Sequence, residues 1–574
     1  MSRNEYKIAY ESNLQKKWQL YNAHTLEKLE VKNFNPNNYK IFNFDVFEYD
    51  PVEEKINILH SIVKKMPKIC GILVLKNNKT YGKTKNNKFY YKCIPDDKRI
   101  PHFLIPYKIK QIGFSKHFTN KYVVFKFDHW NEKHPHGILT NVIGNVGKLE
   151  NFYEYQLYVK SLYSSIQDFT KATKLKLRQI SQETLVKTAF EKYNIDDRRD
   201  YTNIYTIDPT CSKDFDDAFS YIEKSEHHIV SIYISNVPIW MNLMELWDSF
   251  SDRIATIYLP DRKRPMLPAI LSDVLCSLQE NETRFAFCID IYIDKTTFKI
   301  IDSKFNNTCI RVKKNYRYKD DLSHIEDITK LTKVLKKTNK FTNYSENIKD
   351  NHDIIAYMMV LMNFICANKM VEYNCGIFRS MKLDKQLEIP KTFPDEVKVF
   401  MKAWKSNGSR YVSFENEEKA HEMLKLNEYI HITSPIRRLV DTLNILEIQD
   451  KMGIMKFTEE SKKFHAYWTN ETQLEYINQT MQSIRRVQSE CELLSKCVNY
   501  PDITTAHHEG YIFDVMERND GLFQYVVFLN KINLINKFIS YKKLEKYSKQ
   551  MFKVFLIEES DTLRQKVRFE LIDN

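Results

Sequence analysis

Apolar and polar positions alternate in two parts of the chain, and this alternation predicts short β-strands. The strand candidates are rich in β-branched and aromatic residues and are separated by turns, which is typical of small β-barrels. The first part has room for two OB-like barrels and the second for one. The candidates are 69–75, 88–94 and 122–127 in the first part, and 509–515, 523–528 and 567–571 in the second.

The middle of the chain mixes helical and strand patterns, which predicts an α/β domain. Helical spacing over 163–200 leads into it, and the run from Ile354 to Met370 predicts a strongly apolar helix with its Met and Leu side chains in the core. Prolines exclude a helix from the stretch around 257–268. Further strands are predicted at 229–234 and 285–292, and the three prolines are Pro260, Pro265 and Pro268.

These patterns predict an α+β multidomain protein, since 574 residues are too many for one core. The N-terminal segment is polar and Asn-rich, which favours an extension over a domain. The expected regions are an extension at 1–45, two OB-like barrels at 46–110 and 111–185, a mixed α/β domain at 186–500 and an OB-like barrel at 501–574.

Charge and composition favour a polyanionic partner. Lys and Arg number 87 against 74 Asp and Glu, and 35 Tyr with 35 Phe supply rings on which bases can stack, a combination that suits single-stranded nucleic acid. The ten cysteines form no CxxC pair, so neither a zinc site nor a disulfide framework is expected. The N-terminus lacks an apolar signal core, and no window approaches 18 continuous apolar residues. We therefore expect a soluble, intracellular, cytoplasmic protein with no membrane partner.

Four aspartates within ten residues are the strongest chemical signal. Asp208, Asp214, Asp216 and Asp217 lie between apolar segments and lack a basic run that could neutralise them. Hard carboxylate ligands suit Mg²⁺, with Mn²⁺ as a possible substitute, and two such ions can promote phosphodiester cleavage. A solvated acidic turn or a calcium loop is the alternative, but the apolar flanks favour a metal site.

A second chemical stretch runs from Tyr429 to Asp441. Ser434 as N-cap and Pro435 at the first helical position predict a helix start, which puts Arg437 and Arg438 in the first turn. Cations there oppose the helix dipole, so the pattern favours a phosphate site over a purely stabilising role. The alternative is that both arginines pair with surface carboxylates.

Four motifs, in this order, resemble the RNB domain of the RNase II/RNase R exoribonucleases. The resemblance extends over about 65–574 and is strongest over 200–445, while the regions Pro95–Pro101 and Trp130–Gly147 resemble the two cold-shock barrels of the eukaryotic, exosome-type branch. We expect a layout without that branch's N-terminal endonuclease domain. The motifs are Thr206–Ala218, Tyr258–Pro268, Leu271–Leu278 and Thr433–Arg438.

The resemblance implies a processive, Mg²⁺-dependent 3′→5′ exoribonuclease that releases 5′-nucleoside monophosphates. Its partner would be single-stranded RNA with a free 3′ end, and a monomer is expected. The four aspartates would hold metal and the scissile phosphate, and Arg437 would stabilise charge on that phosphate. The residues that the resemblance assigns to RNA binding are Tyr258, Tyr318, Arg438 and Glu490.

Three departures from the family pattern support an alternative function. Asn236 stands where an Asp is usual, Ala356-Tyr357 replaces a glutamate pair, and Leu443-Asn444 replaces His-Arg. A catalytically weak or inactive RNA-binding adaptor on the same scaffold would tolerate these changes. A metal-dependent phosphatase for small substrates is a third class, which three OB-like barrels disfavour.

Overall fold

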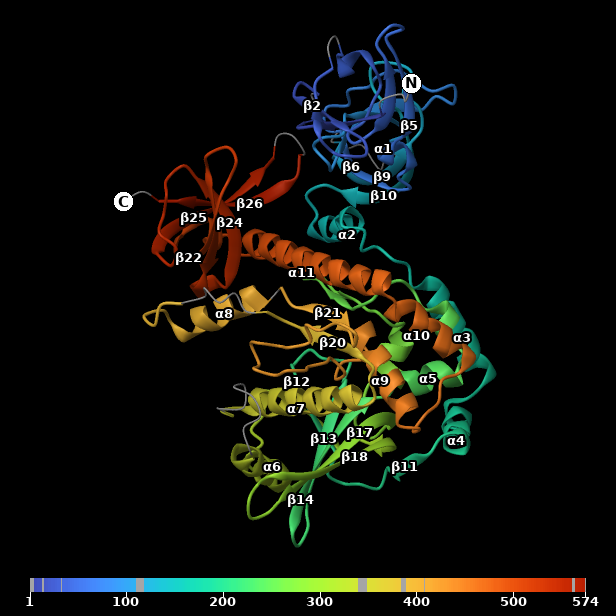
Figure 1. The fold of residues 1–574 in the computed structure, drawn as a ribbon, viewed down its shortest axis with the longest axis vertical. Coiled ribbons are helices and arrows are strands. Elements are labelled where there is room, and N and C mark those ends of the chain that lie inside the picture. The colour runs from blue at the N-terminus through green and yellow to red at the C-terminus, as the bar shows by residue number, and fades with distance from the viewer. Residues whose placement is uncertain are drawn as a thin grey trace. The chain divides into compact units, whose positions relative to one another are not determined.

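The computed structural model describes residues 5–12, 15–31, 34–109, 118–338, 348–382, 389–406, 408–559 and 563–572. The chain forms two compact units, coloured by residue number in Figure 1. The first unit comprises Met1–Tyr163, Leu259–Asp261 and Val487–Asn574, and the second comprises Ser164–Tyr258 and Arg262–Arg486.

The first unit contains three five-stranded sheets with one shared strand order. When the strands of each sheet are numbered along the chain, that order is 3-2-1-4-5, which is the order of an OB barrel. The N-terminal sheet contains β1 (Glu5–Tyr10), β2 (Trp18–Asn22), β3 (Lys28–Leu29), β4 (Val46–Asp50) and β5 (Lys55–His60). The second contains β6 (Ile69–Leu73), β7 (Phe89–Pro95), β8 (Phe103–Tyr107), β9 (Lys121–Phe127) and β10 (Gly137–Asn145). The C-terminal sheet contains β22 (His507–Glu517), β23 (Phe523–Leu529), β24 (Leu534–Ser540), β25 (Lys549–Glu558) and β26 (Gln565–Leu571).

Contacts between the outer strands close two of these sheets. In the second sheet the Leu104 amide donates to the Pro135 carbonyl at 2.9 Å, and Leu104 bridges His136 just before β10. In the C-terminal sheet the Asn536 side chain donates to the Val567 carbonyl at 2.8 Å. The predicted OB-type fold class is confirmed.

Strand pairing joins the residues expected as an N-terminal extension to the first sheet. β1 pairs with β4, so the sheet crosses the expected division at 45/46, and Tyr6, Ile8 and Tyr10 of β1 are buried in its core. The alternation of these three apolar side chains with polar ones was a strand signal inside an Asn-rich segment. The expected division at 110/111 likewise falls within the second sheet, since β6 pairs with both β7 and β9.

The second unit is built on a seven-stranded sheet in the order β11-β18-β17-β14-β13-β12-β19. Its central strands alternate between two apolar cores: Ile232 and Ile234 face one, and Tyr233 faces the other. The helices α6 (Glu326–Lys337) and α7 (Asn351–Glu372) cover the first face (Figure 1). The strands are β11 (Ile195–Arg198), β12 (Tyr205–Asp208), β13 (Asp217–Glu223), β14 (His227–Ser235), β17 (Thr283–Asp294), β18 (Ile300–Arg311) and β19 (Lys314–Arg317).

The predicted apolar helix is confirmed as α7 (Asn351–Glu372). By length and composition alone it could cross a membrane, but its buried residues, among them Met358, Leu361 and Met362, belong to the core against the sheet. A second core gathers Trp240, Trp247 and other side chains from the helices around α9 (Leu439–Lys451).

The remaining elements complete the two units. The helices are α1 (Ile62–Lys65), α2 (Leu149–Val159), α3 (Gln167–Gln179), α4 (Gln182–Lys192), α5 (Val237–Leu243), α6 (Glu326–Lys337), α8 (Asp395–Ser406), α10 (Glu459–Thr469), α11 (Glu471–Asn499) and α12 (Asp502–Thr505). The short strands are β15 (Ile257–Tyr258), β16 (Lys263–Arg264), β20 (Ile377–Ser380) and β21 (Arg410–Ser413). Among the proline-rich residues, β15 and β16 form a hairpin, as expected of a stretch that cannot be helical.

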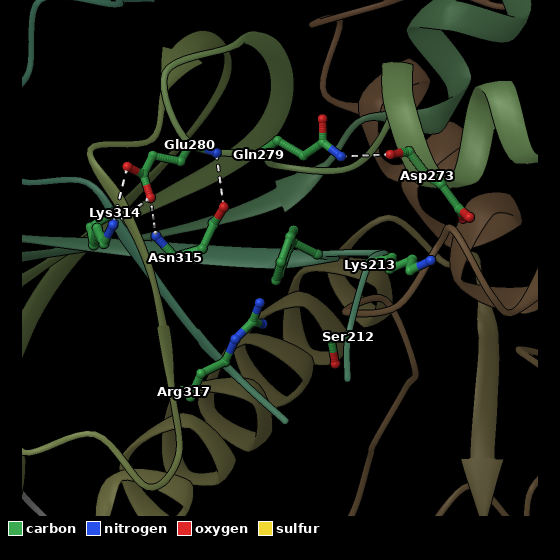
Figure 2. A pocket seen from close by; sticks show the side chains of 9 residues that line it. Ser212, Lys213, Asp273, Gln279, Glu280, Lys314, Asn315 and Arg317 are labelled. Carbon is green, nitrogen blue, oxygen red and sulfur yellow. Dashed lines mark hydrogen bonds and ion pairs between the residues drawn. The ribbon is translucent and has the colours of Figure 1, made fainter. Parts of the chain in front are cut away.

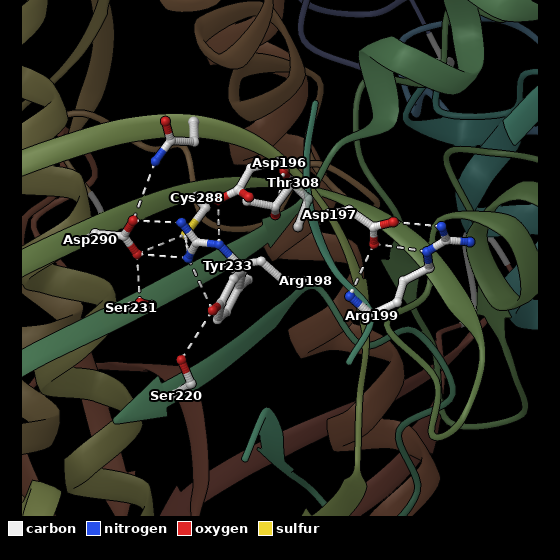
Figure 3. A network of polar contacts seen from close by, with 12 residues as sticks. Asp196, Asp197, Arg198, Arg199, Ser220, Ser231, Tyr233, Cys288, Asp290 and Thr308 are labelled. Atoms are coloured by element: carbon white, nitrogen blue, oxygen red, sulfur yellow. Dashed lines mark hydrogen bonds and ion pairs between the residues drawn. The ribbon is translucent and has the colours of Figure 1, made fainter. Parts of the chain in front are cut away.

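One buried polar network ties the sheet of the second unit together. Arg198 of β11 forms a two-pronged ion pair with Asp290 of β17, with N–O distances of 2.8 and 2.6 Å. Ser231, Tyr233 and Cys288 surround the pair (Figure 3).

Candidate active site

The four aspartates lie at one end of the seven-stranded sheet. β12 ends at Asp208 and its antiparallel neighbour β13 begins at Asp217, with Tyr205 paired to Phe219. The loop between the strands carries Asp214 and Asp216. The hairpin therefore gathers the cluster that the sequence singled out.

Hydrogen bonds from a distant segment fix the loop before Asp216. The Phe215 amide donates to Ser277 Oγ at 3.0 Å, and that hydroxyl donates to the Lys213 carbonyl at 2.8 Å. The Leu278 amide donates to the Phe215 carbonyl at 3.0 Å, and the Ser235 amide to the Asp216 carbonyl at 2.8 Å. The backbone around Asp216 is thus positioned by the fold.

Asp216 and Arg437 join the two chemical stretches of the sequence. Asp216 Oδ2 accepts from Arg437 Nε at 3.0 Å, and its Oδ1 accepts from the Ile436 amide at 2.9 Å. The Asp216 side chain is 4% exposed and that of Arg437 is 45% exposed. A terminal nitrogen of Arg437 also donates to Ser434 Oγ at 3.0 Å. Asp216 and Ser434 thus hold the Arg437 guanidinium in place, while part of the side chain stays exposed.

The predicted helix start at Ser434–Pro435 is wrong, because α9 begins at Leu439. Residues from Pro435 form a turn in which the Arg437 and Arg438 amides donate to the Ser434 carbonyl. Arg438 is extended and bridges Ala255, and the Leu439 amide donates to Ile254. This backbone pairing keeps the residues out of a helix, so Arg437 is aimed by a turn and by Asp216.

Arg438 points to an internal carboxylate. Its terminal nitrogen donates to Asp441 Oδ1 at 2.7 Å, and the same oxygen accepts from the Ser434 amide at 2.7 Å. The Asp441 side chain is fully buried. The alternative of surface ion pairs therefore applies to neither arginine, since Arg437 also binds a buried aspartate.

Asp214 has its own cation, which the sequence did not reveal. Lys263 Nζ lies 3.0 Å from Asp214 Oδ1 and 2.9 Å from Asp273 Oδ1. The Tyr258 hydroxyl donates to Asp214 Oδ2 at 3.4 Å, and the Tyr258 side chain is exposed. Lys263 is 49 residues from Asp214 in the chain, and only the β15–β16 hairpin brings it there.

An open pocket of about 550 Å³ lies beside the aspartate loop (Figure 2). Asp273, which also forms an ion pair with Lys263, lines this pocket. The Arg317 guanidinium carbon lies 5.4 Å from the centre of the Phe215 ring. Lys314 is neutralised by Glu280. The residues that line it are Ser212, Lys213, Phe215, Asp273, Gln279, Glu280, Lys314, Asn315 and Arg317.

Burial and mutual repulsion raise the pKa values of three of the aspartates. Burial raises the pKa of Asp216 to about 6, with Asp214 adding to the shift and Arg437 and the Ile436 amide partly offsetting it. Burial, followed by the charges of neighbouring aspartates, also raises the pKa of Asp208 and Asp217. The site thus holds more negative charge than the protein neutralises.

The donor set fits a hard divalent cation. In the described part of the chain, Asp208 and Asp217 form no ion pair with a Lys or Arg, whereas Asp214 and Asp216 do. A cation would relieve the repulsion between these carboxylates, whose oxygens are preferred ligands of Mg²⁺ and Mn²⁺. Their oxygens do not form a tight cage: among the described residues, the group with three ligand atoms within 4.8 Å is Asp350, His352 and Asp353, where Asp350 caps α7.

Tyr318 lies close to the aspartates and Glu490 belongs to the other unit. The Tyr318 amide donates to the Asp208 carbonyl at 3.0 Å, and the half-buried ring meets His352 edge-on at 5.1 Å. Burial, with the charges of Asp217 and Asp208, raises the pKa of Tyr318 to about 12. Glu490 is exposed on α11, and its assignment to RNA binding stays a prediction.

The three departures from the family pattern occupy structural positions. Asn236 caps α5 through the Ile239 amide and donates to Asn307 at 2.8 Å. Tyr357 is buried in the core of α7, and Asn444 bonds both backbone groups of Ile377. None of these side chains contacts one of the four aspartates through a hydrogen bond in the described residues.

Family models match two segments of the chain. Residues 197–349 match the RNB domain, and residues 90–155 match the Dis3-like cold-shock domain 2. The first match includes all four aspartates. The second agrees with the expected resemblance to the exosome-type branch.

A curated relative is ribonuclease R of Mycoplasmopsis pulmonis, which is 27% identical over 399 residues. That alignment covers 57% of this chain and 54% of the relative. The chain spans 54% to 64% of the length of the first four ribonuclease R relatives it matches.

Two solved structures share the fold. Mycoplasma genitalium RNase R in complex with ribose-methylated single-stranded RNA superposes with a TM-score of 0.66 at 15% identity, covering 99% of this chain and 100% of that chain. Yeast Ssd1, described as a pseudonuclease, gives 0.55 at 13% identity, covering 93% and 78%. The RNB-domain model thus matches the segment that contains the aspartate cluster, and the chain is similar to ribonuclease R over about half of its length.

Proposed function

We propose that the protein is a divalent-metal-dependent 3′→5′ exoribonuclease that shortens single-stranded RNA processively and releases 5′-nucleoside monophosphates. The observation that carries this proposal is the pairing of the buried Asp216 with the outward-facing Arg437 beside two aspartates without a cationic partner in the described chain. The RNB-domain match and the similarity to ribonuclease R support RNA as the substrate.

The residues divide into metal holders and a phosphate binder. Asp208 and Asp217 would hold Mg²⁺, or Mn²⁺ in its place, with Asp214 and Asp216 completing the site. The metal would supply activation of water and neutralisation of the leaving oxygen. Asp216 and Ser434 orient Arg437, whose exposed face stabilises charge that develops on the scissile phosphate.

The RNA end is held by aromatic side chains near the aspartates. The Tyr258 side chain is exposed and its hydroxyl donates to Asp214 Oδ2, and Tyr318 follows the strand paired with Asp208. Either ring can stack on or clamp a 3′-terminal base. The three OB barrels supply further single-strand binding. We propose a monomer that acts in the cytoplasm.

An inactive RNA-binding adaptor is the second candidate. A pseudonuclease is among the structural neighbours, and three family positions are altered here. The retention of all four aspartates and Arg437 disfavours it. The two candidates differ in one observable, which is cleavage of RNA that the protein binds.

Asp217→Asn is the variant that separates them. This change keeps the size of a side chain that forms no ion pair in the described chain, so the fold should survive while metal binding is lost. The wild-type chain and the variant are incubated with Mg²⁺ and 5′-labelled single-stranded RNA, and products are resolved at single-nucleotide spacing. Asp197→Asn, an exposed carboxylate paired with Arg199, is the matched control.

We expect wild type and Asp197→Asn to shorten the RNA from the 3′ end to a small limit product, and Asp217→Asn to bind it intact. If the wild-type chain binds RNA without shortening it, the adaptor function replaces this one. Cleavage by Asp217→Asn at the wild-type rate would contradict the assigned metal holders.

A further inference from the structure

A second arginine of the same unit is buried without a carboxylate partner. Arg379 lies on β20, is 9% exposed, and its guanidinium stands over the Tyr411 ring at 4.8 Å. Within the described chain it forms no ion pair with Asp or Glu. A buried charge is costly unless it is paired, so this position needs a reason.

The surroundings of Arg379 are positive. Burial, followed by the charge of Arg438, lowers the pKa of Arg379, and burial, followed by the charge of Arg379, lowers the pKa of Arg485. Burial together with Arg438 and Arg379 holds the pKa of His431 well below its usual value. The carboxylate that acts on this group is Asp441, one oxygen of which already accepts from Arg438 and the Ser434 amide.

The same cluster contains polar atoms whose bonding is incomplete. Among the described residues, Arg438 Nε, Asp441 Oδ2 and His421 Nδ1 are buried and have no hydrogen-bond partner. His431 Nδ1 is bonded to the Tyr411 hydroxyl at 2.8 Å. Of these atoms, Arg438 Nε is a donor and Asp441 Oδ2 is an acceptor. Native cores satisfy nearly all such atoms, so the unbonded Arg438 donor in a positive site indicates a missing acceptor.

The cluster lies next to the candidate active site. Arg438 follows Arg437 in the chain, and its side chain is 23% exposed, which gives the cluster an opening. Arg437 donates to Asp216 of the aspartate cluster, while Arg438 donates to Asp441. Two arginines in succession therefore face two different anionic positions.

We propose that Arg379, with Arg438 and His431, forms a second phosphate subsite that binds the backbone phosphodiester next to the one held at Arg437. Arg379 acts there as a positioning residue, and its guanidinium offers the forked donors that match phosphate oxygens. This inference rests on the proposed function, since it takes the ligand to be an RNA strand in the same site.

Arg379→Met tests the subsite, with Arg410→Met as the control. Methionine keeps an unbranched apolar side chain over Tyr411 and removes the charge. Arg410 is the neighbour of Tyr411 on β21, and its side chain is 61% exposed beside Glu475, so its loss removes the same charge from the same hairpin. Binding of 5′-labelled oligoadenylate to the full chain is measured with a chelator present, so that no cleavage intervenes.

We expect Arg379→Met to weaken binding about 10- to 100-fold, as for a lost hydrogen bond to a charged group, and Arg410→Met to change it little. The slope of log affinity against log salt should fall by about 0.7 for the lost phosphate contact. The unfolding temperature of Arg379→Met should stay the same or rise, because an uncompensated charge is removed. A lower unfolding temperature would show that Arg379 serves the fold, and would overturn the proposal.

A scan of the RNA locates the contact. Single linkages near the 3′ end are replaced by uncharged methylphosphonates, and one of them should weaken wild-type binding but not binding by Arg379→Met. Inorganic phosphate should compete only weakly, since it offers one anion in place of a strand. Equal scans for both proteins would overturn the subsite alone, whereas a wild-type chain that does not bind RNA would overturn the proposed function.

Discussion

Two arginine–aspartate pairs in the second unit differ in how completely their charges are satisfied. Asp290 accepts from both terminal nitrogens of Arg198, from Ser231 Oγ at 2.6 Å and from Asn306 at 3.3 Å (Figure 3). Burial acts to raise the pKa of Asp290, but Arg198 and the other donors bring it below its usual value. The charges of this pair, which we call the closed pair, are therefore compensated within the protein.

In the Asp216–Arg437 pair, which we call the open pair, the aspartate is buried, whereas the arginine is partly exposed. Asp216 is as buried as Asp290, yet its pKa is raised, because burial and a neighbouring aspartate outweigh one arginine and one amide. The Arg437 side chain is 45% exposed, against 6% for Arg198. A buried ion pair that is complete serves the fold, and one that is left incomplete among like charges is available for chemistry.

Breaking the closed pair should have the largest effect on stability. Arg198→Met leaves Asp290 buried without its cation, and we expect the free energy of unfolding to fall by about 3–5 kcal/mol. Urea unfolding measures the loss. Arg199→Met is the control, since Arg199 pairs with Asp197 at the surface, where such pairs contribute about 0–1 kcal/mol.

The same comparison predicts that Arg198→Met leaves catalysis by the folded fraction unchanged. Cleavage rates per folded molecule, measured well below the unfolding transition, should match the wild type. Equal destabilisation by Arg198→Met and Arg199→Met would show that the closed pair has no special place in the fold.

Breaking the open pair should act on rate instead. Arg437→Gln removes charge stabilisation at the phosphate, and we expect the single-turnover cleavage rate to fall by about 10²–10³-fold. The unfolding temperature should fall less than that of Arg198→Met, because 45% of the Arg437 side chain is exposed and Asp216 keeps its hydrogen bond from the Ile436 amide. Arg437→Lys keeps the charge but loses the forked contacts to Asp216 and Ser434, so its rate should be intermediate.

A control for this experiment is Arg518→Gln, which removes an exposed arginine paired with Asp520 in the C-terminal barrel. Its rate should stay within a few fold of wild type. If Arg437→Gln cleaves RNA as fast as this control, Arg437 has no role in the chemical step.

The sequence predicted the elements that depend on local pattern. The apolar run of α7, the strands at 229–234 and 285–292 and the cluster of four carboxylates were all visible in it. Periodic burial produces periodic sequence, and like charges placed close together in the chain remain close in a hairpin. The start of the first barrel was placed too late, at residue 46, because the alternation of Tyr6, Ile8 and Tyr10 lies in a segment whose Asn-rich composition favoured an extension.

The partners of the site could not be predicted because they come from distant segments. The residues next to Lys263 in the sequence do not indicate its contact with Asp214. Those next to Arg379 do not indicate that it is buried without a carboxylate partner. The start of α9 was misplaced for a similar reason: pairing of Arg438 with Ala255 overrides a local helix signal. Tertiary hydrogen bonds decide such positions, and single-chain patterns do not contain them.

The smallest predicted effect is a difference between the two pairs in how their contribution to folding stability depends on pH. Since the pKa of Asp216 rises from 3.8 to about 6 on folding, the folded protein binds more protons than the unfolded chain between these values. The stability contributed by this group is therefore greatest below about pH 4 and is lost as pH rises toward about 6. Asp290, with its lowered pKa, acts in the opposite direction: its contribution is present above about pH 4 and is lost as the solution becomes more acidic.

Divalent metal should restore the folding stability that the Asp216 site loses as pH rises. Deprotonated carboxylates bind Mn²⁺ or Mg²⁺, and a ligand that binds only the folded state stabilises it, so the metal-induced rise in unfolding temperature should be larger at about pH 8 than at about pH 5. Asp217→Asn should reduce that rise and make the metal-free protein more stable at alkaline pH, because it removes one of the repelling charges. Asp197→Asn should leave both quantities unchanged, since Asp197 is paired with Arg199 outside the cluster. A rise that is equal at the two pH values, or equal in both variants, would mean that the metal binds away from these aspartates and that their raised pKa values serve another purpose.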